Sequence, residues 1–384
     1  MICKYKIITL GCKLNYAESA TIARALREQG MQPASKGEAA QKVVINSCAV
    51  TAESEHKTRE MIRRAVRENP GAEIVVSGCY AKLREKEIMA IQGVSRVETQ
   101  KSLTAYSTSG RTRSFLKVQD GCDFHCSYCT VWRARGASRN APIADLVNSA
   151  RAIAATGARE IVLTGVNIGD FGRTTGESFL DLLIALDKVE GVDRYRISSI
   201  EPNLLTDEII AFCALSPKFM PHFHIPLQSG CNSILQVMGR RYTAQFFADK
   251  IDSIRAIMPN VFIGVDVIVG FPGETDDNFT DTMRLLQRVR PSFLHVFPYS
   301  ARPDTPAAGM EGQVAPGVKK ERAARLGALS EELLSEFTTK QQKAEHAILV
   351  EGRDKNGLLF GHTENYIRME IEGGDQLINT IVKR

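Results

Sequence analysis

Short apolar runs alternate with amphipathic stretches through the first quarter of the chain. Each apolar run is of strand length, and each amphipathic stretch repeats its apolar positions every three or four residues, as a helix does. Strand–helix repetition at this spacing predicts a small parallel sheet with helices on its faces. A polar stretch at 101–112 then predicts a linker. The predicted strands are 5–10, 42–46 and 73–77, and the helices that follow them are 15–29, 53–68 and 84–91.

The same alternation is repeated six times between about residue 113 and residue 335. Helical patterns separate the apolar runs, among them 142–156, 179–189 and 278–289. Six units are too few for a closed eight-fold barrel, so we expect an open six-fold (β/α) barrel. A long helix is predicted at 318–343. The six predicted strands are 114–119, 160–163, 195–200, 222–227, 261–269 and 293–297.

The pattern changes at about residue 344, where short strand candidates are separated by Gly, Asn and Asp. These candidates, at 347–351, 357–361, 366–371 and 377–382, predict a small antiparallel β-barrel. The predicted fold class is therefore α/β, with a parallel N-terminal domain, a central open barrel and a C-terminal β domain. We expect the three domains to span residues 1–105, 113–340 and 344–384.

The chain has 384 residues, of which 43% are hydrophobic and 24% are charged, as expected for a globular protein of two or three domains. No apolar run is long enough to span a bilayer, and the N-terminus lacks the apolar core of a secretory signal. We therefore expect a cytoplasmic protein without a membrane partner. In that reducing compartment, the nine cysteines are more typical of metal binding than of disulfides.

The net charge of +5 permits nucleic-acid binding without requiring it. Two groups of arginines are candidate phosphate contacts. Their alternative role is an ordinary solvated surface. One group recurs every four residues on a predicted helix, and the other follows the densest group of cysteines; they are Arg59, Arg63 and Arg67, and Arg133, Arg135 and Arg139.

Three cysteines lie within eight residues, in Cys122-Asp123-Phe124-His125-Cys126-Ser127-Tyr128-Cys129. They follow the first predicted barrel strand in a polar loop, whereas buried spectator cysteines would be scattered among apolar residues. A structural zinc site needs four ligands and usually pairs two knuckles, and no fourth ligand follows nearby. A cubane iron–sulfur cluster accepts thiolates from such a loop. With three thiolates, one iron keeps an open position.

The predicted barrel also carries polar residues and glycines at the C-terminal ends of its strands, where barrels place their chemistry. Any one of them could serve only the turn in which it lies. Together they predict a single site at one mouth of the barrel. They are Gly165-Val166-Asn167, Ser198-Ser199 with Glu201, Gln228-Ser229, Asp266 with Gly270, and Pro298-Tyr299-Ser300.

A second trio, Cys12, Cys48 and Cys79, is dispersed along the predicted N-terminal domain. Each cysteine comes one or two residues after a predicted parallel strand. Neighbouring parallel strands bring their C-terminal ends together, so these thiols are expected to converge at one crevice. Three small buried hydrophobic residues are the alternative. The equivalent placements favour a second three-thiolate cluster. Cys3, Cys213 and Cys231 have no such neighbouring cysteines, and we do not expect them to be ligands.

The cysteine loop resembles the signature of the radical S-adenosylmethionine superfamily. Nearly the whole chain resembles the methylthiotransferases within it, and the tail 361–366 is similar to their terminal RNA-binding barrel, the TRAM domain. The matching segments are Thr9-Leu10-Gly11-Cys12-Lys13-Leu14-Asn15, Val44-Ile45-Asn46-Ser47-Cys48-Ala49-Val50-Thr51, Ser77-Gly78-Cys79-Tyr80-Ala81, Arg135-Gly136, His224-Ile225-Pro226-Leu227-Gln228-Ser229-Gly230, Asp266-Val267-Ile268-Val269-Gly270-Phe271-Pro272-Gly273-Glu274-Thr275 and Val296-Phe297-Pro298-Tyr299-Ser300.

The resemblance implies two [4Fe-4S] clusters and S-adenosylmethionine, which serves as radical source and as methyl donor. Cys122, Cys126 and Cys129 would hold the radical cluster, while the N-terminal trio would hold the sulfur-delivering cluster. Tyr128, Gly165, Ser199, Glu201 and Gln228 are the residues expected to bind S-adenosylmethionine. The implied partners are tRNA and an electron donor such as flavodoxin.

Segments 163–169 and 197–202 are most similar to the branch that acts on N6-threonylcarbamoyladenosine, next to the tRNA anticodon. Two sister branches remain alternatives, one for isopentenyladenosine in tRNA and one for an aspartate of a ribosomal protein. A different class is a non-catalytic iron–sulfur RNA-binding protein that senses redox state. The chain departs from the family at Val131-Trp132, where an aliphatic residue and proline are usual. Trp132 is expected to pack against the loop or to stack on a base.

Overall fold

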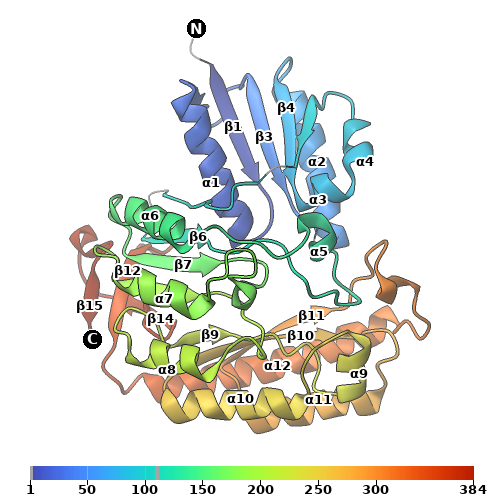
Figure 1. Ribbon diagram of the computed structural model, residues 1–384, viewed down its shortest axis with the longest axis vertical. Coiled ribbons are helices and arrows are strands. Elements are labelled where there is room, and N and C mark those ends of the chain that lie inside the picture. Colours follow the sequence, from blue (N-terminus) through green and yellow to red (C-terminus); the bar gives the residue numbers. More distant parts are fainter. Residues whose placement is uncertain (1–2, 50, 100, 109–111) are drawn as a thin grey trace.

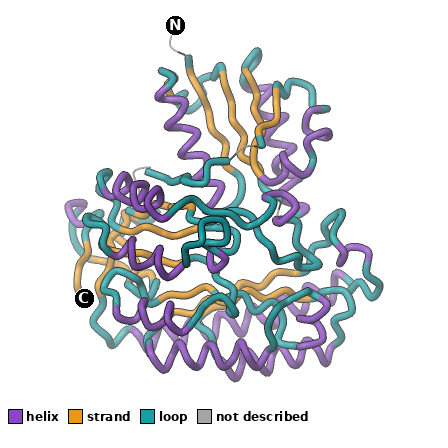
Figure 2. The backbone as a smooth tube through the Cα atoms, viewed as in Figure 1, coloured by secondary structure: helices purple, strands orange, loops and turns teal. Residues whose placement is uncertain are grey.

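The computed structural model describes residues 3–49, 51–99, 101–108 and 112–384. Val50 of one matching segment and residues 109–111 of the predicted linker lie outside these ranges. A small α/β unit sits above an open barrel, and the C-terminal strands lie against one side of the barrel (Figure 1). Loops are concentrated where the upper unit meets the barrel (Figure 2).

The N-terminal unit is built on a five-stranded parallel sheet with the order β2-β1-β3-β4-β5. Its three central strands confirm the prediction, and Ile7, Val44 and Val75 align across them. The two strands at the edges were not predicted, because they are very short and mostly exposed and therefore carry no apolar run. The strands are β1 (Lys4–Thr9), β2 (Gln32–Pro33), β3 (Lys42–Ser47), β4 (Glu73–Gly78) and β5 (Arg96–Glu98).

Helices follow the central strands of this sheet, as α1 (Lys13–Glu28), α2 (Ala52–Glu68), α3 (Cys79–Leu83) and α4 (Glu85–Met89). The helix predicted at 84–91 corresponds to α4, whereas the short helix α3 before it was not predicted. The backbone of Arg84 has φ −131° and ψ 39°, outside the helical region, and this residue separates α3 from α4.

Six parallel strands form the barrel, as two three-stranded sheets ordered β6-β7-β8 and β9-β10-β11. A single parallel bridge between Ser199 and His224 connects the two sheets. The open six-fold barrel is therefore confirmed. Its strands are β6 (Arg113–Lys117), β7 (Glu160–Thr164), β8 (Arg194–Ile197), β9 (His222–His224), β10 (Phe262–Val269) and β11 (Phe293–Pro298).

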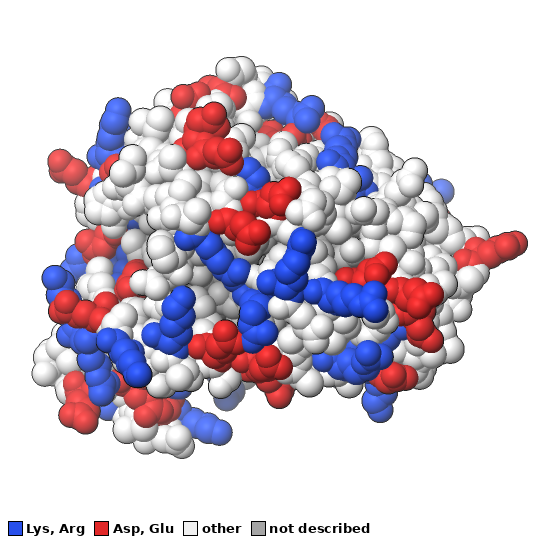
Figure 3. Space-filling view, turned by 90° about the horizontal axis from the view of Figure 1, so that it is seen from below, with Lys and Arg blue, Asp and Glu red and all other residues white. Residues whose placement is uncertain are grey.

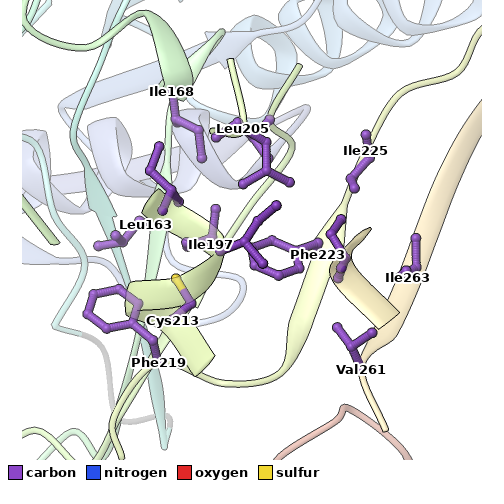
Figure 4. Packing of buried hydrophobic residues seen from close by; sticks show 14 of the residues in the cluster. Leu163, Ile168, Ile197, Leu205, Cys213, Phe219, Phe223, Ile225, Val261 and Ile263 are labelled. Carbon is purple, nitrogen blue, oxygen red and sulfur yellow. The ribbon is translucent and has the colours of Figure 1, made fainter. Parts of the chain in front are cut away.

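Helices cover the outside of the barrel and bury its apolar core against the strands. In Figure 4, Leu163, Ile197, Phe223 and Ile263 from successive strands point into one packed cluster that also holds Cys213. The long predicted helix at 318–343 is α12 (Pro316–Gln341). The other helices of the barrel are α6 (Ile143–Ala154), α7 (Phe179–Asp187), α8 (Asp207–Leu215), α9 (Asn232–Val237), α10 (Ala244–Ile257) and α11 (Asp276–Val289), whereas α5 (Val131–Arg135) packs against α3 of the N-terminal unit.

The C-terminal strands form an antiparallel sheet with the order β14-β13-β12-β15. They are β12 (Ala347–Arg353), β13 (Leu359–Thr363), β14 (Arg368–Ile371) and β15 (Ile381–Lys383). This sheet is docked on the strand starts of the barrel by buried arginines. Arg194 donates to the carbonyls of Ala347 and His362, and Arg113 forms an ion pair with Glu351 at 2.6 Å. The docking leaves the opposite mouth of the barrel facing the N-terminal unit.

Candidate functional site

A chamber of about 290 Å³ lies where the C-terminal strand ends of the barrel face those of the N-terminal sheet. All six cysteines of the two trios line it. The five residues expected to bind S-adenosylmethionine line it as well, namely Tyr128, Gly165, Ser199, Glu201 and Gln228. Residues that are far apart in the sequence therefore share one enclosed space.

The N-terminal trio is placed by adjacent strands of the parallel sheet. Cys12, Cys48 and Cys79 follow β1, β3 and β4, which are neighbours in the sheet. Gly78, with φ +98°, allows the turn from β4 into Cys79, and a Cβ there would lie 2.2 Å from the carbonyl oxygen of Ser47. The turn that presents this thiol therefore requires glycine.

Asn15 connects two of these turns. Its amide donates to the side chain of Asn46 at 2.8 Å and to the carbonyl of Ser47 at 3.1 Å, and its Oδ1 accepts a hydrogen bond from Cys12. Gly11 at φ +114° keeps the backbone before Cys12 close to Cys48, because a Cβ there would lie 3.0 Å from the Cβ of Cys48. Hydrogen bonds and close backbone contact thus hold the first two cysteine turns together.

The central trio is carried by a loop whose thiols accept hydrogen bonds. The amide of Phe124 donates to the sulfur of Cys122 at 3.3 Å, and the amide of Val131 donates to that of Cys129 at 3.4 Å. Burial raises the pKa of Cys122 to about 11 and that of Cys129 to about 12. Metal ligation requires the thiolate form, and burial disfavours that form of both cysteines. A bound metal cation must therefore stabilise the thiolates.

The donor set fits an iron–sulfur cluster. Each trio offers three soft thiol ligands, the type that binds such clusters. Within residues 3–49, 51–99, 101–108 and 112–384, no three His, Cys, Asp or Glu side chains converge as tightly as a single metal ion requires. The chamber also contains buried Asn167, whose amide nitrogen and oxygen have no hydrogen-bond partner among the described residues, which fits a space built for a polar ligand.

Arg240 is a chamber residue that the sequence analysis missed. Its guanidinium is ion-paired with Glu201 and lies 3.4 Å from both the sulfur of Cys126 and the hydroxyl of Tyr128. Burial raises the pKa of Glu201, although Arg240 opposes this effect. Gly165 is required by the chain itself, since a Cβ there would lie 2.7 Å from Cγ2 of Ile168.

A buried network of charges joins the N-terminal unit to the barrel beside Cys79. Arg135 donates to the sulfur of Cys79 at 3.2 Å and pairs with Glu18 and Asp120, both at 2.9 Å. Lys117 pairs with the same two carboxylates at 3.0 and 2.7 Å. Burial raises the pKa values of Glu18 and Asp120, but Arg135 and Lys117 outweigh it, so both pKa values are lowered. Both carboxylates are therefore ionised.

This network corrects one expectation. Arg135 was a candidate phosphate contact, but its side chain is only 2% exposed and serves the domain interface. Arg133 and Arg139 remain exposed, as do Arg63 and Arg67 on α2. In the view from below, basic and acidic side chains are interspersed over the surface (Figure 3). The indole nitrogen of Trp132 is buried without a hydrogen-bond partner among the described residues, and its ring packs edge-on against His125.

A second cavity of about 580 Å³ lies in the lumen of the barrel, lined by residues of β8, β9, β10 and β11, and it adjoins the chamber. Ser199 lines both spaces. His224 lines the lumen and contacts Asp266 of the chamber at 2.7 Å. Lys13, next to Cys12, also lines the lumen; enclosure by protein lowers its pKa, and nearby Arg196 lowers it further. We call this space the lumen cavity.

The three remaining cysteines lie elsewhere. Cys213 is packed in the apolar core, and Cys3 is exposed. The sulfur of buried Cys231 lies 3.2 Å from the side-chain nitrogen of Asn278. None of these three lines the chamber.

Two family models match separate parts of the chain. The family model described as Uncharacterized protein family UPF0004 matches residues 4–97, and that of the Radical SAM superfamily matches residues 116–286. Among solved structures, the chain is similar to the radical S-adenosylmethionine methyltransferase TsrM from Kitasatospora setae, with a TM-score of 0.59 and 14% identity. That match covers 80% of this chain and 77% of the other, and it shows a shared fold.

Curated relatives match along nearly their whole length. One from Bacillus subtilis, named threonylcarbamoyladenosine tRNA methylthiotransferase MtaB, is 38% identical over 98% of this chain and 92% of its own. Its namesake from Thermotoga maritima is 35% identical over 96% and 91%. A tRNA-2-methylthio-N(6)-dimethylallyladenosine synthase from Carboxydothermus hydrogenoformans is 30% identical over 99% and 95%.

An open parallel barrel with three loop thiols at its mouth, matched by the superfamily model, defines a radical S-adenosylmethionine protein. The second thiol trio lies outside the barrel, in the separate N-terminal α/β unit. At 38% identity over nearly the full length of a curated relative, the chain belongs to the radical S-adenosylmethionine methylthiotransferase family. Its cofactors are accordingly S-adenosylmethionine and [4Fe-4S] clusters. No helix in the described ranges combines the length and apolar character needed to cross a membrane.

Proposed function

We propose that this protein is a tRNA methylthiotransferase that converts N6-threonylcarbamoyladenosine, next to the anticodon, into its 2-methylthio derivative. The observation that carries the proposal is the single chamber lined by both thiol trios. A methylthio transfer needs a site that generates a radical and a site that delivers sulfur within reach of one substrate atom. The names of the most similar relatives support the choice of substrate.

Each trio has a separate role in this proposal. Cys122, Cys126 and Cys129 would hold the cluster that binds S-adenosylmethionine, while Cys12, Cys48 and Cys79 would hold the cluster that delivers sulfur. The cluster that Cys122, Cys126 and Cys129 would hold would, once reduced by an external donor, supply the one electron that splits S-adenosylmethionine into methionine and a carbon radical. Such a radical can abstract hydrogen from the unactivated carbon 2 of adenine, which no side-chain base can deprotonate.

Five chamber residues would hold S-adenosylmethionine, and the structure suggests how the chain orients them. Arg240 fixes the carboxylate of Glu201 and lies close to the hydroxyl of Tyr128. Gln228 adopts φ +68°, an unusual backbone for a residue other than glycine, which places it at the turn after β9. Gly165 and Ser199 complete the set.

We assign the protein three domains, spanning 1–105, 113–340 and 344–384. tRNA is the macromolecular substrate, and an electron donor such as flavodoxin would deliver single electrons. A cytoplasmic location follows from this substrate and from thiols that must stay reduced.

Analysis of tRNA nucleosides by mass spectrometry tests the substrate. In a strain that lacks this protein, the 2-methylthio form of threonylcarbamoyladenosine should disappear while its unmodified precursor accumulates. If the methylthio form of isopentenyladenosine disappears instead, the protein belongs to the sister branch that modifies isopentenyladenosine. An unchanged nucleoside profile would contradict both assignments.

Two triple variants test the division of roles in the purified, reconstituted protein. Replacing Cys122, Cys126 and Cys129 by alanine should abolish formation of 5′-deoxyadenosine from S-adenosylmethionine. Replacing Cys12, Cys48 and Cys79 should preserve 5′-deoxyadenosine formation but stop methylthiolation. If the wild-type protein formed no 5′-deoxyadenosine with dithionite, the redox-sensor alternative would be favoured.

A further inference from the structure

The lumen cavity adjoins the chamber in which the reaction would take place. The two spaces share Ser199 as a common lining residue, and the pair of His224 with Asp266 stands between them. With a volume of about 580 Å³, the lumen cavity is within the range that ordinary ligand pockets occupy. The lumen cavity is therefore a direct neighbour of the chamber and is large enough to hold a substituent of a base.

One cation that lines this cavity has no ion-pair partner among the described residues. Three arginines that line it or the adjoining pocket are each paired with a carboxylate: Arg196 with Glu160 at 3.1 Å, Arg113 with Glu351 at 2.6 Å and Arg368 with Asp354 at 3.3 Å. Lys13 lines the lumen cavity and a neighbouring pocket that also holds Arg113. No carboxylate of the described residues lies within ion-pair distance of its ammonium group, although Glu160 attracts that charge at longer range. A cation that lines a cavity without an ion-pair partner favours an anionic ligand there.

A second observation points to a polar ligand in the same place. His222 lines the lumen cavity and is 91% buried, and its Nδ1 has no hydrogen-bond partner among the described residues. Buried polar atoms in folded proteins are nearly always paired, so an orphan here suggests that a partner is supplied by a ligand. The ring itself is held between Phe262 and Tyr366.

We propose that the lumen cavity receives the N6 substituent of the substrate adenosine and that Lys13 contacts the carboxylate of that substituent. This inference rests on the proposed function. The threonylcarbamoyl group ends in a carboxylate and also offers a hydroxyl and a carbonyl, which suit Lys13 and His222. An isopentenyl group offers none of these and would leave both side chains unpaired. Lys13 thereby acts as a specificity-determining residue.

The test uses an anticodon stem-loop RNA that carries threonylcarbamoyladenosine, beside the same RNA with its threonyl carboxylate converted to the methyl ester. Fluorescence anisotropy gives the affinity of the reconstituted holoenzyme for each RNA, and mass spectrometry gives the rate of methylthiolation. We expect the wild-type protein to bind the acid about 10- to 100-fold more tightly than the ester, as is typical for hydrogen bonds to charged groups. Lys13→Met should reduce this preference to about one, whereas Lys13→Arg should retain most of it.

Lys86, exposed on α4, supplies a matched control, and Lys86→Met should keep the wild-type preference. Because Lys13 adjoins Cys12, iron and sulfide are counted in every variant. The comparison of acid and ester in the wild-type protein needs no variant, and equal affinity for the two would overturn the inference. A Lys13→Met protein that still prefers the acid would overturn it as well.

The inference and the proposed function fail in different ways. If the holoenzyme modifies the isopentenyl RNA and leaves the threonylcarbamoyl RNA unchanged, the proposed function is wrong. If it modifies the threonylcarbamoyl RNA but does not distinguish acid from ester, only the role of Lys13 is wrong.

Discussion

Replacing Arg135 by methionine should destabilise the protein by several kilocalories per mole. Arg135 and Lys117 together neutralise Glu18 and Asp120 in a nearly dry interface. Methionine keeps the length of the side chain but removes its charge, so of the two buried cations that pair with these carboxylates among the described residues, Lys117 alone then remains. Breaking a buried ion pair on one side typically costs about 3–5 kcal/mol. We expect the free energy of unfolding to fall by about that amount.

Urea denaturation of the cluster-free protein measures this change, followed by the fluorescence of Trp132, the single tryptophan, which lies on the same short helix α5. Arg139→Met is the matched control. Arg139 also pairs with Asp120, at 3.4 Å, but its side chain is 44% exposed, so its loss should cost about 1 kcal/mol or less. Equal effects of the two substitutions would refute the reasoning.

A double substitution tests whether the cost comes from unbalanced charge. Glu18→Gln in the Arg135→Met background removes one of the two carboxylates and leaves Asp120 paired with Lys117. The double variant should therefore be more stable than the sum of the two single effects predicts, by about 0.5–3 kcal/mol. Strict additivity would mean that the network is not a coupled unit.

Three further predictions follow from the same geometry. Glu18 and Asp120 have lower pKa values in the folded than in the unfolded chain. The stability they contribute is therefore present at neutral pH and is lost as the pH falls below about 4. Urea titrations at a series of pH values measure this loss. Gly78→Ala should displace the turn before Cys79 and reduce the reconstituted iron content by about half, because one of the two proposed clusters loses its site. Gly71→Ala is the control, since there is open space around Gly71. It should lower the free energy of unfolding by about 1–2 kcal/mol and leave the iron content unchanged. Cys231→Ser should also leave the iron content unchanged, and a loss of iron in that variant would contradict its exclusion from both trios.

Much of this architecture could be predicted from the sequence because its signals are local. Apolar runs of strand length with amphipathic helices between them indicated the central strands of the N-terminal sheet and the six strands of the barrel. The loop from Cys122 to Cys129 holds its three thiols within eight residues, so no tertiary information is needed to recognise it. Even the convergence of Cys12, Cys48 and Cys79 follows from one rule, that neighbouring parallel strands end at the same edge of a sheet.

Other features were decided only by the tertiary structure. The edge strands β2 and β5 are strands because their backbones pair with a neighbouring strand. Their side chains are not buried, so the sequence carries no apolar run at these positions. Glu18 and Arg135 are separated by 117 positions, and neither differs in sequence from a surface charge. Arg240 and Lys13 likewise gain their surroundings from elements far away in the chain.

The sequence by itself determined the order of the elements, the two thiol trios and the ends of the barrel strands at which a site should lie. Only the tertiary structure determined that the two trios share one chamber, which charges are buried together and that a second cavity adjoins the chamber. The physical reason is that an element's periodicity records which of its faces is buried. The partner buried against that face depends on how distant elements pack, and short-range patterns do not record that packing.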